Sequence, residues 1–218
     1  FFDLDDTLWA FSLNARDTYE EMYWKYGYDR YFDSFEHYYS LYQRRNLDLW
    51  AEYADGKVTK EELNRQRYLY PLEAVGAGDS TLAKAYERDA LTMIPTKSKL
   101  MPHGREVLEY LSGKYNLYIL SNGFKELQSH KMRSSGIDEY FKKVVLSDDI
   151  GILKPWPEIF HFALSTTQSE LNNSLMIGDS WENDIVGAAG VGMHQVFYNL
   201  SGRTDLPFAP TYQITDLK

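Results

Sequence analysis

The sequence has no cysteine among its 218 residues. This absence excludes disulfide bonds, cysteine nucleophiles and thiolate zinc sites, and it is compatible with a reducing compartment. Basic residues are also scarce. The chain has 23 Lys and Arg residues against 32 Asp and Glu residues, which gives a formal net charge of −9. We therefore expect neither a nucleic-acid polymer nor an anionic membrane as a partner, since both attract basic surfaces.

Long hydrophobic runs are missing as well. No apolar stretch approaches the roughly 20 residues that a membrane-spanning helix needs, and no signal-peptide pattern is visible, so we expect a cytoplasmic protein. The chain begins without Met, inside an apparent strand, and we expect further residues to precede Phe1. A hydrophobic content of 44% is enough for a core, and the length suits one domain or a domain with an insertion.

The order of the predicted elements separates two parts of the chain. Residues 14–95 carry helical spacing and helix caps with no convincing strand, and we expect Pro71 and residues 76–78 to end the third helix of this block. From residue 96 onwards, short apolar runs alternate with helices, which indicates a parallel sheet covered on both faces. We therefore predict an α/β core formed by residues 1–13 and 96–218, interrupted by a helical domain of residues 14–95.

Residues 1–8, FFDLDDTL, are the centre of the functional prediction. Phe, Leu and Thr favour strands, so we expect Asp3 and Asp5 at the carboxyl end of a buried strand, where open α/β sheets bind ligands. A spacing of two points both carboxylates to one face. Such a pair is costly unless a cation lies between them or one keeps a proton. The alternative is an acidic turn that caps a helix.

Two later stretches also follow predicted strands. Ser121, Asn122 and Gly123 can offer a hydroxyl and backbone N–H groups to an anion, or they can cap a helix. Lys154, between an apolar residue and Pro155, can neutralise a phosphate or the carboxylates, or it can be an ordinary loop lysine.

A third stretch adds two more acids. Asp179 follows a strand, and Asp184 lies about one helical turn further on. Together with Asp3 and the backbone carbonyl of Asp5, Asp179 supplies the oxygen ligands that Mg²⁺ prefers. The alternative is that Asp179 and Asp184 bind no metal and only stabilise the start of a helix, where the helix dipole favours negative charge.

In chain order, the patterns Asp-x-Asp-x-Thr, Ser-Asn-Gly, Lys-Pro and Gly-Asp-Ser-x-x-Asn-Asp resemble the four motifs of the haloacid dehalogenase-like hydrolase superfamily. The resemblance covers residues 1 to about 200. It implies a Rossmann-like α/β fold with an inserted helical C1 cap, and a Mg²⁺-dependent phosphatase. Dehalogenases of this superfamily lack an acid two residues after the nucleophile, because a halide needs no proton. Asp5 therefore favours phosphate transfer.

The resemblance also implies residue roles. Asp3 corresponds to the nucleophile that becomes an aspartyl-phosphate, and Asp5 corresponds to the general acid/base. The remaining implied roles are phosphate binding by Thr7, Ser121, Asn122, Gly123 and Lys154, Mg²⁺ binding by Asp3, the Asp5 carbonyl and Asp179, and support of the lysine or metal by Asp184.

Substrate choice lies with the cap in such enzymes. Residues 1–9, 49–59 and 121–124 resemble bacterial nucleoside 5'-monophosphatases that favour pyrimidine nucleotides. We therefore expect a nucleoside monophosphate as substrate, and Trp9 is a candidate to contact its base. We expect the protein to be a monomer or a small homo-oligomer. The alternatives are a phosphosugar or other small-metabolite phosphatase of the same superfamily, and a receiver-like module that only accepts phosphate on an aspartate. The cap aromatics Tyr19, Tyr23, Trp24, Tyr26 and Trp50 are expected to form the core of the cap.

Overall fold

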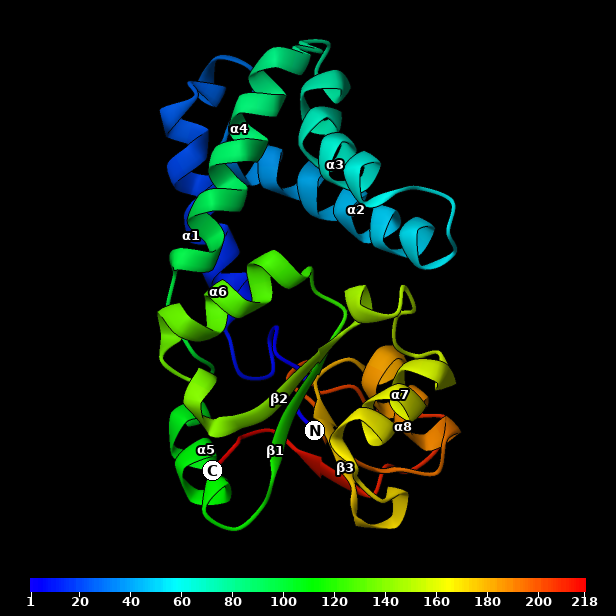
Figure 1. The fold of residues 1–218 in the computed structure, drawn as a ribbon. Helices are drawn as coiled ribbons and strands as arrows, with labels where there is room; N and C mark the ends of the chain where they lie inside the picture. Colours follow the sequence, from blue (N-terminus) through cyan, green and yellow to red (C-terminus); the bar gives the residue numbers. More distant parts are fainter. The chain divides into compact units, whose positions relative to one another are not determined.

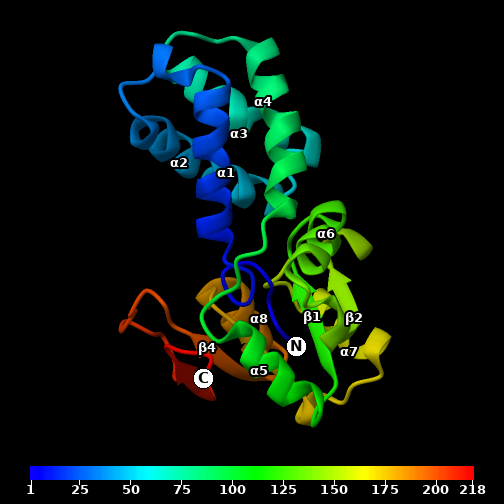
Figure 2. The same cartoon turned by 90° about the vertical axis from the view of Figure 1, so that its left-hand side faces the viewer.

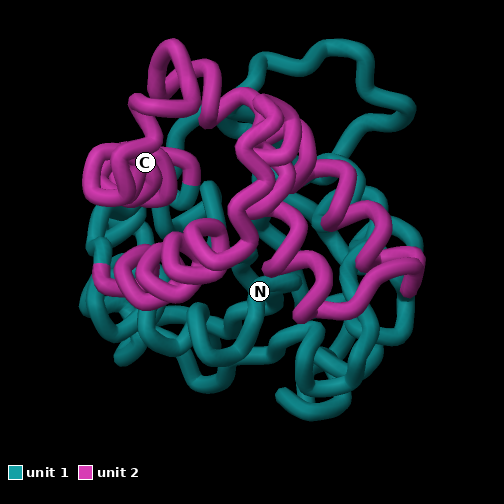
Figure 3. Tube along the Cα trace, turned by 90° about the horizontal axis from the view of Figure 1, so that it is seen from above, with its two compact units in different colours: residues 1–11, 97–218 teal, residues 12–96 magenta.

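The computed structural model describes residues 1–218. The chain divides into two compact units, one made of Phe1–Phe11 and Lys97–Lys218 and the other of Ser12–Thr96, coloured separately in Figure 3. We call them the α/β unit and the helical unit. Their bounds lie within two residues of the sequence-derived ones. No helix of the structure is long and apolar enough to cross a membrane.

The sheet of the α/β unit contains five parallel strands and one bridging segment. Strand β2 (Phe141–Leu146) pairs with β1 (Leu117–Ser121), and β3 (Leu175–Gly178) pairs with β4 (His194–Tyr198), which pairs with β5 (Tyr212–Ile214). Phe2 forms parallel bridges to Ile119 of β1 and to Ile177 of β3, and so joins the two sets of strands. The predicted fold class, a parallel α/β sheet, is confirmed.

The opening segment is shorter as a strand than the sequence indicated. It pairs with the strands of the sheet through bridges at Phe2, supported by Asp3 N–H donating to the Ile177 carbonyl at 2.9 Å and Leu120 N–H donating to the Phe2 carbonyl at 2.9 Å; a further, local bridge joins Asp5 to Trp9. At Leu4 the backbone turns, since its carbonyl accepts the N–H groups of both Leu8 and Trp9. The sheet therefore delivers Asp3 to its carboxyl edge, and Asp5 follows within a turn.

Helices pack around this sheet. Figure 1 shows α5 (Gly104–Ser112) and α6 (Lys125–Ser135) on one side of the strands and α7 (Pro157–Thr167) and α8 (Gly187–Gly190) on the other. The α7 and α8 side carries a continuous apolar core that includes Phe160, Met176 and Ala188. The helix predicted for residues 181–189 begins as a π-helix, Trp181–Val186, and only then becomes α8. β4 and α5 are labelled in the view of Figure 2.

The helical unit contains α2 (Phe35–Ala54), α3 (Lys60–Ala74), α4 (Ser80–Met93) and α1 (Phe11–Lys25) from its second residue on. Short polar side chains cap three of the four helices, because Ser34, Thr59 and Asp79 accept N–H groups of the first turns of α2, α3 and α4. The prediction that Pro71 ends the third helix is wrong. That helix continues for three more residues, to Ala74, although an interior proline removes one N–H from the hydrogen-bond ladder and its ring crowds the carbonyl four residues earlier.

Tyrosines build much of the core of the helical unit. Tyr19 is buried, its hydroxyl lies 2.6 Å from the hydroxyl of Tyr42, and its ring packs against those of Tyr68 and Tyr86. The expectation that the cap aromatics form this core is correct for Tyr19 and Tyr23 and wrong for Trp24, whose side chain is 61% exposed.

Candidate active site

A buried lysine is at the centre of the charged cluster. The Lys154 side chain is 2% exposed, and its Nζ donates to Asp3 Oδ1 at 2.6 Å, to Asp184 Oδ1 at 2.6 Å and to the Leu120 carbonyl at 2.8 Å. These three acceptors use the three donors of an ammonium group. Burial alone lowers the pKa of Lys154, but the charges of Asp184 and Asp3 outweigh it, so the pKa is raised. Lys154 therefore stays charged at neutral pH.

Asn122 holds the Lys154 segment in place. The Lys154 N–H donates to Asn122 Oδ1 at 2.7 Å, and Asn122 Nδ2 donates to the Lys154 carbonyl at 3.0 Å. The sequence assigned Asn122 to phosphate binding. In the structure its side-chain amide ties the end of β1 to the lysine loop, and its role in phosphate binding stays a prediction.

Asp179 and Asp184 complete an acidic group with Asp3. One carboxylate oxygen from each lies within 4.8 Å of the other two. Asp184 is fixed by Lys154 and by the Ser180 N–H, which donates to its second oxygen at 3.1 Å. Gly178 makes room for this arrangement, since a Cβ there would lie 2.1 Å from Asp184 Oδ2.

The electrostatics of this group favour an added cation. Desolvation is the largest cause that raises the pKa of Asp3 well above its usual range; Lys154 opposes it, and Asp184, Asp179 and Asp5 add to it. Desolvation, followed by the charge of Asp184, raises the pKa of Asp179 to about 7. Three carboxylates share one lysine, so a hard divalent cation with a preference for oxygen ligands fits the donor set.

Thr7 supports Asp179. Its hydroxyl donates to Asp179 Oδ1 at 2.8 Å and accepts the Asp179 N–H at 3.1 Å. Thr7 is fully buried. The structure joins the Thr7 hydroxyl to Asp179, and the role in phosphate binding that the resemblance implied for Thr7 stays a prediction.

Ser121 and Gly123 form a second group with a residue that the sequence analysis missed. Ser121 Oγ accepts the Gly123 N–H at 3.2 Å and Gln128 Nε2 at 2.8 Å, so its own hydrogen donates to no protein acceptor. That hydrogen is available to an anion. Gly123 is required by packing, because a Cβ there would lie 2.0 Å from Gln128 Nε2.

Asp5 belongs to this second group. Its carboxylate receives Lys131 Nζ at 2.8 and 3.0 Å and Gln128 Nε2 at 2.9 Å, both from α6. Lys131 and Gln128 were not identified as site residues from the sequence. The only available signal was their spacing of three on the helix that follows Ser121.

Trp9 is fully buried, and its indole N–H donates to the Lys97 carbonyl at 3.2 Å. Its ring lies 4.8 Å from Lys131 Nζ. Trp9 thus contacts the lysine that holds Asp5, and its contact with a substrate base stays a prediction.

Comparison with known proteins identifies the family of this chain. The family model described as haloacid dehalogenase-like hydrolase matches residues 1–192. The chain belongs to this hydrolase family. The resemblance seen in the four motifs is therefore confirmed at the level of the family and the fold.

Individual relatives cover almost the whole chain. Pyrimidine 5'-nucleotidase YjjG from Escherichia coli is 28% identical over 100% of this chain and 93% of its own length. A glyceraldehyde 3-phosphate phosphatase from Pyrococcus furiosus is 31% identical over 100% of this chain and 88% of its own. The crystal structure of HAD-hydrolase YfnB from Bacillus subtilis, bound to magnesium, aligns with a TM-score of 0.86 and 26% identity over 99% of this chain and 93% of that one.

Proposed function

We propose that the protein is a Mg²⁺-dependent phosphomonoesterase that acts through an aspartyl-phosphate on Asp3, with nucleoside 5'-monophosphates as substrates. The observation that carries the proposal is the lysine-centred group, in which Lys154 contacts Asp3 and Asp184 while Asp179 lies beside them. A carboxylate held against an ammonium group and next to a cation site is suited to attack an anionic phosphate.

The residues present fit a magnesium ion. Asp3, Asp179 and the backbone carbonyl of Asp5 would hold it, with Asp184 in support. When bound, Mg²⁺ would offset the repulsion between these carboxylates and the phosphate and stabilise negative charge on the transferring group. The magnesium in the YfnB structure supports this assignment.

The residues around Lys154 and the residues around Asp5 would take different parts in the reaction. In the first step an oxygen of Asp3 bonds to phosphorus, the bond from phosphorus to the leaving oxygen breaks, and that oxygen takes a proton from Asp5. In the second step water gives a proton to Asp5 and attacks phosphorus, and the Asp3–phosphorus bond breaks. Lys154 balances charge on Asp3 throughout, and the Ser121 hydroxyl and the N–H groups near Gly123 bind phosphate oxygens. Splitting hydrolysis in this way gives two easier displacements.

Asp5 also favours a phosphate ester over a haloacid as substrate. A halide leaves without a proton, whereas an alkoxide needs one, and a positioned acid contributes about 10²–10⁴-fold to such a step. The Escherichia coli relative supports a pyrimidine nucleotide. A phosphosugar is the second candidate, because the Pyrococcus furiosus relative is a glyceraldehyde 3-phosphate phosphatase.

The test is phosphate release from a panel of 5'-nucleotides and glyceraldehyde 3-phosphate, and chloride release from 2-chloropropionate, with Mg²⁺ or with EDTA. We expect turnover of pyrimidine nucleotides with Mg²⁺ only. Asp3→Asn should abolish turnover. Asp6→Asn is the matched control, since Asn tolerates the left-handed backbone found at Asp6, whose φ is 58°. Near-normal activity of Asp3→Asn would exclude Asp3 as the nucleophile, and preferred hydrolysis of glyceraldehyde 3-phosphate would exclude the nucleotide assignment.

A further inference from the structure

Lys131 is a second buried lysine, and the proposed function gives it no role. Lys131 lies on α6, and its side chain is 4% exposed. Its two hydrogen bonds go to the two oxygens of Asp5, at 2.8 and 3.0 Å. A buried ammonium group is costly unless it is paired. The ion pair with Asp5 therefore explains how Lys131 can be buried, and it fixes both oxygens of that carboxylate.

The surroundings of Lys131 restrict where its ammonium group can go. Its Nζ lies 4.8 Å from the centre of the Trp9 ring and 5.1 Å from that of Phe11. Aromatic faces attract a cation and leave it no further hydrogen-bond acceptor. The lysine is thus packed on the aromatic side and free to donate on the side where Asp5 lies.

Gln128 connects Asp5 to Ser121. It stands one helical turn before Lys131, is completely buried, and its Nε2 donates to Asp5 at 2.9 Å and to Ser121 Oγ at 2.8 Å. One amide group thereby links the carboxylate to the hydroxyl proposed to bind phosphate. Residues three apart lie on one face of a helix, so α6 presents both groups to Asp5 together.

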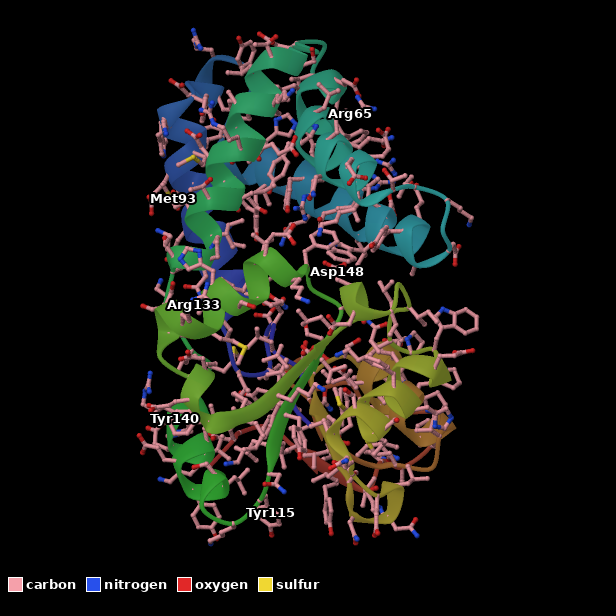
Figure 4. All side chains as sticks on the ribbon, viewed as in Figure 1. Arg65, Met93, Tyr115, Arg133, Tyr140 and Asp148 are labelled. Carbon is pink, nitrogen blue, oxygen red and sulfur yellow. The ribbon has the colours of Figure 1, made fainter.

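Figure 4 labels Arg133, on the same helix two residues after Lys131. Arg133 is exposed, whereas Lys131 is buried. The helix therefore carries one cation that contacts the candidate acid and another of the same sign that does not, which provides a matched control.

We propose that Lys131, assisted by Gln128, is the positioning residue for Asp5 and sets the direction in which Asp5 passes its proton to the leaving oxygen. The inference rests on the proposed phosphatase activity. As Asp5 gives up its proton and the bond from phosphorus to the leaving oxygen breaks, negative charge returns to the carboxylate. An ammonium group already aligned with both oxygens stabilises this charge without further rearrangement.

The test compares two substrates that differ in their need for a proton. Benzyl phosphate releases an alkoxide that must be protonated, and 4-nitrophenyl phosphate releases a stable phenolate. Each kcat/KM value covers the steps from substrate binding to departure of the leaving group and excludes hydrolysis of the aspartyl-phosphate. The ratio of the two values therefore compares the step in which the two esters differ. A group that only supports the fold or binds phosphate changes both values together.

Lys131→Met keeps the length of the side chain and removes its charge. We expect kcat/KM for benzyl phosphate to fall by at least about tenfold and by no more than the ~10²–10⁴-fold that a positioned acid contributes. The value for 4-nitrophenyl phosphate should change by less than about twofold on the same scale. Lys131→Arg should recover most of the loss, and Arg133→Met should change neither value. Gln128→Met removes the hydrogen bonds to both Asp5 and Ser121, so it should lower both kcat/KM values, with the larger loss for benzyl phosphate. This variant remains informative if Lys131→Met fails to fold.

The outcomes separate the two proposals. If the unmodified protein hydrolyses neither these two esters nor any member of the nucleotide and sugar-phosphate panel, the proposed function fails. If it hydrolyses both, and the Lys131 and Gln128 variants lower both kcat/KM values equally or lower neither, the phosphatase proposal stands and the positioning role of Lys131 is overturned.

Discussion

Replacing Lys154 with methionine should damage stability as well as catalysis. The substitution keeps the volume of the side chain but removes the ammonium group that contacts two carboxylates at 2.6 Å. Asp184 is 1% exposed at its side chain and Asp3 is 12% exposed, so neither can recover full hydration. Breaking a buried ion pair from one side typically costs about 3–5 kcal/mol.

That loss is large against a typical free energy of unfolding of about 5–15 kcal/mol. For a chain of this length, about 1 kcal/mol corresponds to a shift of roughly 2–4 °C in Tm. We therefore expect the Tm of Lys154→Met to fall by roughly 6–20 °C on that scale, measured by circular dichroism at pH 7.5 without metal. Turnover should be lost.

The direction of the pH effect follows from the carboxylates. Without Lys154, which lowers the pKa of Asp3, the folded carboxylates hold protons to higher pH than the unfolded ones. The stability of the variant should thus decrease as pH rises through the carboxyl range, and its difference from the parent should be smaller at pH 4.5 than at 7.5. Mg²⁺ should recover more Tm in the variant than in the parent.

A double variant isolates the interaction. Lys154→Met combined with Asp184→Asn removes both members of the more buried pair, so its destabilisation should be smaller than the sum of the two single effects by about 1–3 kcal/mol. Additive effects, or a Tm for Lys154→Met within about 2 °C of the parent on the scale used above, would refute the view that Lys154 is what makes the acidic group tolerable.

Two further predictions concern metal binding. Thr7→Val removes the hydroxyl that orients Asp179, and we expect a roughly 10–100-fold weaker Mg²⁺ affinity by isothermal titration calorimetry, whereas Thr7→Ser, which keeps the hydroxyl, should bind normally; equal affinities for the two variants would contradict the role of Thr7. Because the pKa of Asp179 is raised to about 7, a metal must displace a proton below that pH, so Mg²⁺ affinity should fall as pH decreases from 8 to 5.5, by up to about tenfold per unit for one proton; an affinity independent of pH in this range would show that Asp179 is already ionised.

The fold class and the lysine-centred contacts were accessible from the sequence for a physical reason. Short apolar runs that alternate with helices require a parallel sheet, and parallel strands bring their carboxyl ends to one edge. Any polar residue directly after such a strand is therefore a candidate neighbour of the others. Asp3, Lys154 and Asp184 stand at or shortly after these ends, and the structure brings them into contact.

Contacts made from within a helix were not accessible in the same way. Gln128 and Lys131 are long polar residues in the middle of α6, where the sequence pattern is indistinguishable from a solvated helix face. Their burial depends on how α6 packs, which is a property of the tertiary structure. Hydroxyl and amide groups posed a similar problem at Thr7 and Asn122, because such groups bond equally well to a phosphate and to protein atoms.

The division of charge between the two groups bears on why two aspartates only two residues apart can do different work. The first group has three carboxylates for one lysine, so its electrostatics favour an added cation. In the second group one carboxylate meets one lysine, with Gln128 as a neutral donor. Once Asp5 has released its proton, its charge is thus balanced by one ammonium group, whether or not a metal is bound. If the two aspartates differ because of their lysine partners, then removing each lysine should have a different effect on activity. Lys154→Met should abolish turnover of every phosphate ester, while Lys131→Met should spare those with good leaving groups. Equal substrate dependence of the two lysine variants would mean that the carboxylates act as one group.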